Sequence, residues 1–410
     1  MFRNVTRYLF MSTALLITAC GGGGGDTPAG GGGNATATIE EVGQLLFEDT
    51  SLSANGNQAC ATCHDSTHGF ADPNASITAP VSEGSIGGRF GNRNAPTAAY
   101  ARFTPAFRKD CTDVNITTPT PCGGQFLDGR RDSLENQARD PFLNDVEMAN
   151  NSEADVVAKV QNAPYADKFR AVFGADVFNN VNTAYDRIVE AIAAYERTAE
   201  FAPFDSKFDC FLQDPAAYPL DDSPTNNEKL GFELFIGEAR CSICHSVPTH
   251  DADPNNDAEP VLFTNFMYFN IGVPRNLANP QGASFTDLGL GTPNTPRDTP
   301  LTSQERDLHR GKFKTPTLRN IALTAPYMHN GVFRDLQQVV EFYFIETKSD
   351  DFYDLDPNQP GDQFAEVNNA ISPEVEFLET NLPAGVTRAT AVSALVAFMN
   401  TLTDGTGSCF

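Results

Sequence analysis

The sequence predicts a mainly α-helical protein in which one folding unit occurs twice. In residues 39–64 a glycine is followed by Leu-Phe at the third and fourth positions and then by C-x-x-C-H, and residues 228–245 repeat this order. Apolar residues recur at helical spacing and alternating strand patterns are few. The helical spacing is found in residues 39–47, 154–172, 181–201 and 228–235.

Further matches extend the repeat beyond the first helix of each unit. Residues 94–97 and 314–317 correspond, as do residues 128–134 and 330–336, where Leu stands five places after Gly in both copies. We therefore expect two homologous domains, roughly 38–215 and 222–410, joined by a turn-rich segment. Segments rich in Pro, Gly, Asn and Asp predict long irregular loops over residues 71–95, 249–260 and 270–308.

Length and charge exclude some classes of function. The 410 residues allow two or three domains, and 40% hydrophobic residues are too many for a disordered chain. The 53 acidic against 28 basic residues argue against a nucleic-acid partner, because a phosphate-binding surface needs clustered Lys and Arg. Charge, where it matters, favours basic protein partners.

The N-terminus resembles a bacterial lipoprotein signal. Arg3 and Arg7 precede an apolar run that ends at Cys20, whose thiol would carry the lipid. The alternatives are an ordinary export signal or a membrane anchor, but the run is shorter than the roughly 20 residues of a membrane span. We expect a signal peptide over 1–19, a Gly-rich tether over 20–37, and a protein held by lipid alone on the periplasmic side of a membrane, the outer membrane being favoured.

The paired C-x-x-C-H motifs predict two covalently attached c-type haems. In each motif two thiols can bond one haem while the following histidine binds its iron. The residues are Cys60, Cys63 and His64 in the first motif and Cys241, Cys244 and His245 in the second. A shared zinc site is the alternative, but zinc gives no reason for a histidine after each pair.

Four further cysteines can form disulfides in an oxidising compartment. Cys111 and Cys122 flank a short loop, whereas Cys210 and Cys409 would tie the end of the first domain to the C-terminus. Sequence alone leaves this pairing open.

Equivalent positions in the two copies of the repeat also allow the distal faces of the two haems to be compared. Twelve residues after Gly331 stands Tyr343, whose phenolate could bind iron, whereas Pro141 at the matching place after Gly129 cannot donate. One haem would then be closed and the other open to a peroxide. Gln137 and Glu147 lie near Pro141, and a carboxylate there could move a proton between the peroxide oxygens.

Together these motifs resemble the bacterial di-haem cytochrome c peroxidase family, including its MauG-type enzymes, over about residues 38–400. The resemblance is carried by both C-x-x-C-H motifs and by residues 92–97, 128–130, 313–320 and 325–331, with Gln137, Pro141 and Glu147 in register. It implies that the haem on His64 is the peroxidatic centre, with Gln137, Pro141 and Glu147 on its distal side. It also implies that the haem on His245 is the electron-transfer centre.

The resemblance further implies a ligand for the second haem and a calcium site. The family's distal ligand stands fourteen residues after the histidine of the Pro-Tyr-x-His segment, which is Tyr343 here, as in MauG-type enzymes, and Met328 is the rival. Calcium would be bound by the Asn94 side chain and by the backbone carbonyls of Thr324 and Pro326.

Two positions depart from the family pattern. Ile86 stands where ordinary members often place a histidine ligand for the resting peroxidatic haem, so we expect an open first haem. Leu127 replaces a tryptophan that lies between the haems, and the chain has no tryptophan at all.

We therefore expect an oxidoreductase that reduces hydrogen peroxide to water with electrons from a small cytochrome c or copper protein. Two alternatives stay open: a MauG-like enzyme that uses peroxide to oxidise side chains of a partner protein, and a non-enzymatic di-haem electron carrier. Leu127 counts against the first of these, and Tyr343 favours it.

Overall fold

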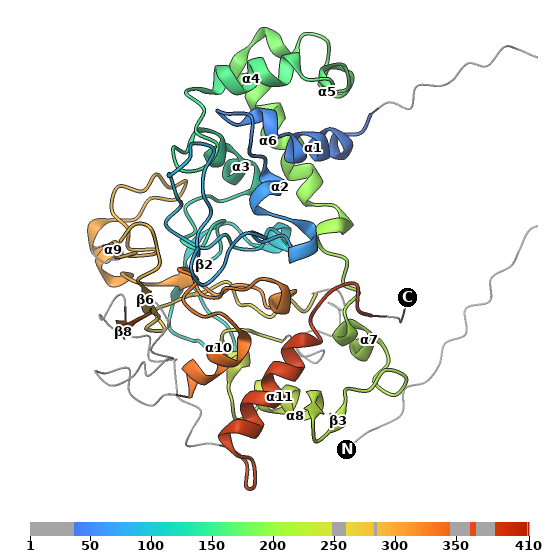
Figure 1. Cartoon of the computed structure of the whole chain (residues 1–410), viewed down its shortest axis with the longest axis vertical. Coiled ribbons are helices and arrows are strands. Elements are labelled where there is room, and N and C mark those ends of the chain that lie inside the picture. Colours follow the sequence, from blue (N-terminus) through green and yellow to red (C-terminus); the bar gives the residue numbers. More distant parts are fainter. Residues whose placement is uncertain are drawn as a thin grey trace, which may run out of the picture. The chain divides into compact units, whose positions relative to one another are not determined.

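The computed structural model describes residues 37–247, 260–282, 285–344, 361–365, 382–407 and 409. Helices dominate these ranges (Figure 1). They are α1 (Ile39–Glu48), α2 (Cys60–Cys63), α3 (Leu134–Leu143), α4 (Glu153–Asn162), α5 (Ala166–Phe173), α6 (Val181–Glu196), α7 (Lys207–Gln213), α8 (Glu228–Ile236), α9 (Ser303–Leu308), α10 (Leu336–Tyr343) and α11 (Arg388–Asn400). The mainly α prediction is confirmed.

The strands are short and form two-stranded antiparallel sheets. The pairs are β1 (Arg108–Cys111) with β2 (Thr120–Cys122), β3 (Asp222–Ser223) with β4 (Asn226–Asn227), β5 (Tyr268–Phe269) with β7 (Phe313–Lys314), and β6 (Pro274–Asn276) with β8 (Gly361–Ala365). An isolated bridge joins Cys122 to Met267, so strands from the two halves of the chain meet there.

The first half is built on the crossing of α1 and α6 (Figure 1). Thr38 begins α1 with a capping box, in which its hydroxyl accepts from the Glu41 amide and the Glu41 carboxylate accepts from the Thr38 amide. Where the helices cross, a Cβ at Gly43 would lie 2.0 Å from the Ala191 carbonyl oxygen. Only glycine permits so close an approach of the two backbones.

The second half repeats this arrangement with α8 and α11 (Figure 1). A Cβ at Gly231 would lie 2.0 Å from the Ala394 carbonyl oxygen, the same relationship as that between Gly43 and Ala191. Each half has its own hydrophobic core, one centred on α1 and α6 and the other on α8 and α11. The described residues nevertheless form one compact unit.

The matching helices α3 and α10 also begin alike. Ser133 and Asp335 are their N-caps, and each accepts a hydrogen bond from an amide in the first turn. Pro141 is the eighth residue of α3 and Tyr343 the eighth of α10, so the two distal candidates occupy equivalent places on equivalent helices.

Several details differ from the expected elements. The helical stretch over 154–172 is interrupted by a turn between α4 and α5. The loop predicted over 270–308 is wrong at β6 and at α9, whose start is fixed by a capping box of Thr302 with Glu305. The loop over 71–95 has no helix or strand, and most of 249–260 lies outside the described residues.

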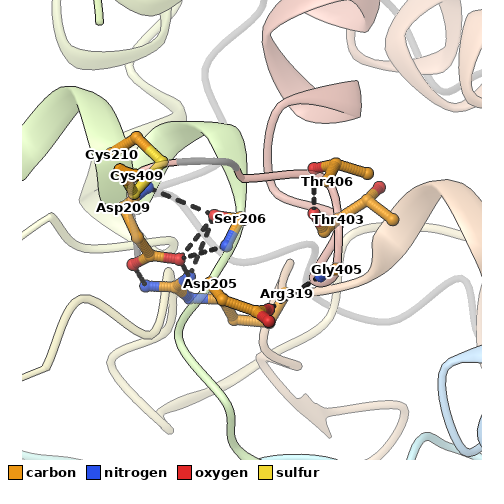
Figure 2. The surroundings of a disulfide bond; sticks show 9 residues. All are labelled: Asp205, Ser206, Asp209, Cys210, Arg319, Thr403, Gly405, Thr406 and Cys409. Carbon is orange, nitrogen blue, oxygen red and sulfur yellow. Dashed lines mark hydrogen bonds and ion pairs between the residues drawn. A yellow bond between two sulfur atoms is a disulfide. The ribbon is translucent and has the colours of Figure 1, made fainter. Parts of the chain in front are cut away.

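The structure contains two disulfides, which join Cys111 to Cys122 and Cys210 to Cys409. The second joins α7 to the C-terminal segment (Figure 2). Residues 1–36, which include Cys20, lie outside the described residues. Within the described ranges, every helix is too short or too polar to span a lipid bilayer.

Candidate functional site: two histidine motifs and their surroundings

The first motif is folded so that the histidine ring is fixed by the backbone. Cys60 and Cys63 lie on the single turn of α2, and His64 follows as its C-cap. The Nδ1 of His64 lies 3.0 Å from the carbonyl oxygen of Phe70. A carbonyl can only accept, so Nδ1 carries the proton and Nε2 is left to bind iron.

The second motif has the same arrangement. The Nδ1 of His245 lies 2.9 Å from the carbonyl oxygen of Phe263. Burial lowers the pKa of His64 and lowers that of His245 to about 4, so both rings are in the neutral form that binds metal. The four motif thiols, on Cys60, Cys63, Cys241 and Cys244, form no disulfide and stand available for thioether bonds.

A cavity of about 360 Å³ surrounds the second motif. Its lining includes Cys241, Cys244 and His245 of the motif together with Met328 and Tyr343. Further apolar lining is provided by Phe235, Leu395 and Met399. Two thiols and one imidazole in an apolar cavity fit a covalently bound haem.

Tyr343 reaches this cavity from the end of α10. Burial raises the pKa of its phenol, and the nearby thiols of Cys244 and Cys241 raise it further. The side chain therefore lies close to the thiols that would hold the second haem. Met328 lines the same cavity, so the structure brings both ligand candidates to the site.

Glu147 lies in the turn that follows α3. Its Oε2 is buried and has no hydrogen-bond partner among the described residues. Burial raises the pKa of this carboxyl, while Arg130 acts in the opposite direction. Burial raises the pKa values of the Cys60 and Cys63 thiols, and the Glu147 charge adds a smaller rise to both, as expected of a carboxyl near the first motif.

The helix before this turn carries Gln137 and Pro141. They stand four residues apart on α3 and therefore share one face of the helix. The amide of Met148 donates to the carbonyl of Pro141, at 3.1 Å, which folds the Glu147 turn back onto the helix end. The three residues predicted for the distal side thus lie on one continuous local structure.

The two positions that depart from the expected family pattern can be placed as well. Ile86 is in the turn beside Glu147, because the amide of the preceding Ser85 donates to the Glu147 carbonyl at 2.7 Å. Leu127 lines the cavity of the second motif, and its carbonyl accepts from the amide of Lys314 at 2.9 Å.

The three residues predicted to bind calcium lie along one cavity. Asn94, Thr324 and Pro326 all line the cavity of the second motif. The Asn94 amide nitrogen donates to the Pro80 carbonyl at 3.0 Å, and its backbone N–H donates to the His329 carbonyl at 2.8 Å. The side-chain oxygen of Asn94 is therefore held in a fixed orientation.

Comparison with known proteins decides the family. A family model described as di-haem cytochrome c peroxidase matches residues 37–217. The methylamine utilization protein MauG of Paracoccus denitrificans is 38% identical over 377 residues, which cover 90% of this chain and 89% of MauG. The chain belongs to the di-haem cytochrome c peroxidase family.

Other members of the di-haem peroxidase family agree with this assignment. The cytochrome c551 peroxidase of Nitrosomonas europaea is 31% identical, with 74% of this chain and 72% of that protein covered. The crystal structure of the diheme peroxidase BthA from Burkholderia thailandensis superposes with a TM-score of 0.71 at 31% identity, over 90% of this chain and 86% of that chain. This chain is accordingly a peroxidase-type oxidoreductase with two c-type haems.

Sequence reasoning missed one buried carboxyl in this di-haem peroxidase. Glu196, at the end of α6, is 7% exposed, and its Oε2 has no hydrogen-bond partner among the described residues. Burial raises its pKa to about 8, and its charge reaches Cys60. In the repeat Glu196 of α6 corresponds to Met399 of α11, so an acid where the other half has an apolar residue is the sequence signal for this carboxyl.

Sequence reasoning also missed a tyrosine between the two halves of this di-haem peroxidase. Tyr100 is 2% exposed and packs in the first core, yet it lines the cavity of the second motif. Its hydroxyl donates to the Asp404 carboxylate, with 2.8 Å to each oxygen. The distance of 304 residues between them hides this contact from any local pattern.

Proposed function

We propose that this protein reduces hydrogen peroxide to water at the haem on His64, with electrons that arrive through the haem on His245. The observation that carries the proposal is the Glu147 carboxyl, which is buried beside the first motif with one oxygen unpartnered. An unpaired buried carboxyl costs free energy unless it faces a ligand. Its position supports a role on the bound peroxide.

The residues around His64 are suited to move protons. The bound haem would supply the iron that binds peroxide and exchanges electrons with it. Glu147 accepts a proton from one peroxide oxygen and returns it to the departing oxygen. Its raised pKa favours both roles at neutral pH, since a carboxyl of ordinary pKa holds a proton too weakly to return it. Gln137, on the preceding helix, orients the peroxide.

The residues around His245 support electron transfer. Tyr343 would bind the second iron, and a phenolate oxygen stabilises ferric iron more than the thioether of Met328 does. Asn94, Thr324 and Pro326 offer oxygen atoms only, which suits calcium. The electron donor would be a small cytochrome or copper protein with a basic face, because the chain carries a formal net charge of −25.

A second candidate is a MauG-like oxidation of side chains on a partner protein. The 38% identity to MauG over 90% of this chain favours it. Both functions begin with the same reaction of peroxide at the first haem, and they differ in what supplies the electrons.

One experiment separates these functions. The haem-loaded protein is mixed with hydrogen peroxide and either a reduced small cytochrome or a candidate partner protein, and donor oxidation and partner mass are followed. Sustained oxidation of the cytochrome, with two electrons consumed per peroxide, is expected. A mass change on the partner without cytochrome turnover would favour the MauG-like function. Two low-spin haems with no peroxide consumption would contradict both.

We also propose that Cys20 carries a lipid and holds the protein on the periplasmic side of a membrane. The supporting features are Arg3 and Arg7, the apolar run and the Gly-rich segment over 20–37. Cys20→Ala should release the protein from membrane fractions, and unchanged membrane association would contradict the proposal.

A further inference from the structure

We propose that Tyr100, hydrogen-bonded to Asp404, is an oxidisable relay that passes electrons between the two haems. This inference rests on the proposed function, because peroxide reduction at the first haem supplies the oxidant. The chain has no tryptophan, and Leu127, at the position where the family has one, cannot be oxidised. The tyrosine would take over the role of such an oxidisable side chain.

Tyr100 is connected to His64 through Phe201 and Phe70. Its backbone N–H donates to the Phe201 carbonyl at 2.8 Å, and the Phe201 ring stacks on Phe70 with centroids 4.1 Å apart. The Phe70 carbonyl accepts from His64, and it also accepts from the amide of Ala98, two residues before Tyr100. A short path of bonds and close contacts therefore leads from His64 to Tyr100.

Tyr100 is connected to the second histidine in a similar way. The Arg319 guanidinium lies 5.4 Å from the centre of the Tyr100 ring and 5.8 Å from that of Phe263. The Phe263 carbonyl accepts from the Nδ1 of His245. Tyr100 also lines the same cavity as Cys241 and Cys244. It is thus part of a packed series of residues that joins both histidines.

Asp404 is held firmly against the phenol. The Asn320 side chain donates to Asp404 at 2.7 Å and accepts from its backbone amide at 2.8 Å. The following residues are tied to the segment just before α7, because the amides of Gly405 and Gly407 donate to Asp205 at 2.7 and 2.8 Å. The disulfide of Cys210 and Cys409 closes this attachment (Figure 2).

The ion pair of Arg319 with Asp209 fixes the other side of the site (Figure 2). The guanidinium donates to Asp209 at 2.5 and 2.8 Å. Burial raises the pKa of Asp404, which favours its taking up a proton. The hydrogen bonds from Tyr100 and Asn320 and the charge of Arg319 lower this pKa, and the charge of Asp209 raises it. The disulfide, Asp205, Asp209 and Arg319 together position the carboxylate that faces Tyr100.

The chemistry of the pair is a coupled loss of an electron and a proton. Burial raises the pKa of Tyr100, so its phenol is protonated at rest. On oxidation the phenol gives one electron toward the first haem and its proton to the Asp404 carboxylate. A neutral tyrosyl radical and a carboxylic acid remain. One electron from the second haem, with return of that proton, restores both groups.

Two other buried tyrosines lack part of this arrangement. The hydroxyl of Tyr268 donates to the Gly123 carbonyl at 2.6 Å, and a carbonyl is too weak a base to take the proton. The hydroxyl of Tyr165 donates to Asp49 at 2.6 Å, but Tyr165 is a first-core residue that is not part of the second cavity wall. Tyr100 has both a carboxylate partner, Asp404, and a position that joins the first core to the wall of the second cavity.

The backbone at Tyr100 is unusual for an aromatic residue. Its φ is 62°, in the left-handed region, and Asn320 occupies the equivalent position in the second half with a φ of 60°. Asparagine tolerates this region more readily than a bulky residue does.

The test is freeze-quench EPR, with optical stopped-flow at both haems, on the haem-loaded full chain after addition of hydrogen peroxide. Wild type is expected to show a narrow organic-radical signal that changes shape when the tyrosines are ring-deuterated. Tyr100→Phe should lose the signal and slow electron transfer between the haems about tenfold or more. Tyr165→Phe removes a similar hydrogen bond between a tyrosine and an aspartate, and it should change neither the radical signal nor the rate of electron transfer.

Asp404→Asn is the second variant, and it keeps the phenol while removing the base. It should slow the transfer and abolish the solvent deuterium isotope effect expected of wild type. These two readouts carry the test should Tyr100→Phe fail to fold. A radical that persists in Tyr100→Phe, or that is lost in Tyr268→Phe instead, would overturn the relay.

Failure of the proposed function gives a different result. Wild-type haems would then not react with peroxide at all. A photochemical ruthenium oxidant replaces peroxide in that case, and the proposal still expects the radical on Tyr100. A photo-oxidised wild type without a Tyr100 radical would overturn it.

Discussion

Gly231 lies so close to Ala394 that a Cβ on the glycine would stand 2.0 Å from the alanine carbonyl oxygen. Gly43 and Ala191 have the same relationship in the first half. In both halves the helix that precedes a C-x-x-C-H motif thus crosses a later helix at a glycine. The duplicated sequence pattern therefore reflects a duplicated packing contact that fixes the position of each motif.

Gly231→Ala should lower the free energy of unfolding by about 1–3 kcal/mol, because the added methyl group would force α8 and α11 apart. Denaturant unfolding of the haem-loaded protein measures this. Gly87→Ala is the matched control, since the nearest atom to its added Cβ is 3.8 Å away, and it should be close to neutral. Equal stability of both variants would contradict the packing argument.

The elements that sequence predicted well are those with local causes. The helices α1 and α8 follow from apolar spacing and from capping at Thr38 and Asn227. The short helix α9 was missed because its capping box lies among Pro, Asp and Thr residues that are typical of loops. In such segments helix-capping residues and loop-forming residues give opposite predictions, and tertiary contacts determine which structure forms.

Glu196 should make stability depend on pH. Its pKa of about 8 in the folded protein exceeds the ordinary 4.5, so the folded state binds this proton more tightly than the unfolded state. The stability contributed is fully present below pH 4.5 and is lost as pH rises through the folded value. Glu196→Gln removes this dependence.

The free energy of unfolding of wild type relative to Glu196→Gln should therefore fall by at least about 1 kcal/mol between about pH 5 and pH 9, since one pKa unit corresponds to 1.36 kcal/mol. Denaturant titrations at several pH values measure it. Glu190→Gln, also on α6 but half-exposed, is the control. A constant difference across this range would contradict the raised pKa.

Tyr343→Phe should alter the optical and EPR spectra of the ferric second haem, because it removes the phenol oxygen proposed as the iron ligand. The first haem should keep its spectrum. Met328→Leu tests the rival ligand in the same cavity and should leave both spectra unchanged. The reverse outcome, with a changed spectrum only in Met328→Leu, would assign the ligand to the thioether.

The site was predictable where the repeat could be aligned. Pro141 and Tyr343 stand at the eighth position of α3 and α10, as the spacing from Gly129 and Gly331 indicates. The Tyr100–Asp404 contact could not be predicted, because it depends on how the C-terminal segment returns to the first half. The Cys210–Cys409 disulfide, one of two pairings left open by sequence, fixes that return.

Glu147 is proposed to move the proton when peroxide is reduced at the first haem. The decisive measurement is the stopped-flow rate at which the haem-loaded protein reacts with hydrogen peroxide. Glu147→Gln should slow this reaction by on the order of 10²-fold or more while both haems stay attached. Asp145→Asn, an exposed change in the same turn, should keep the wild-type rate. A near-normal rate in Glu147→Gln would show that this carboxyl does not move the proton.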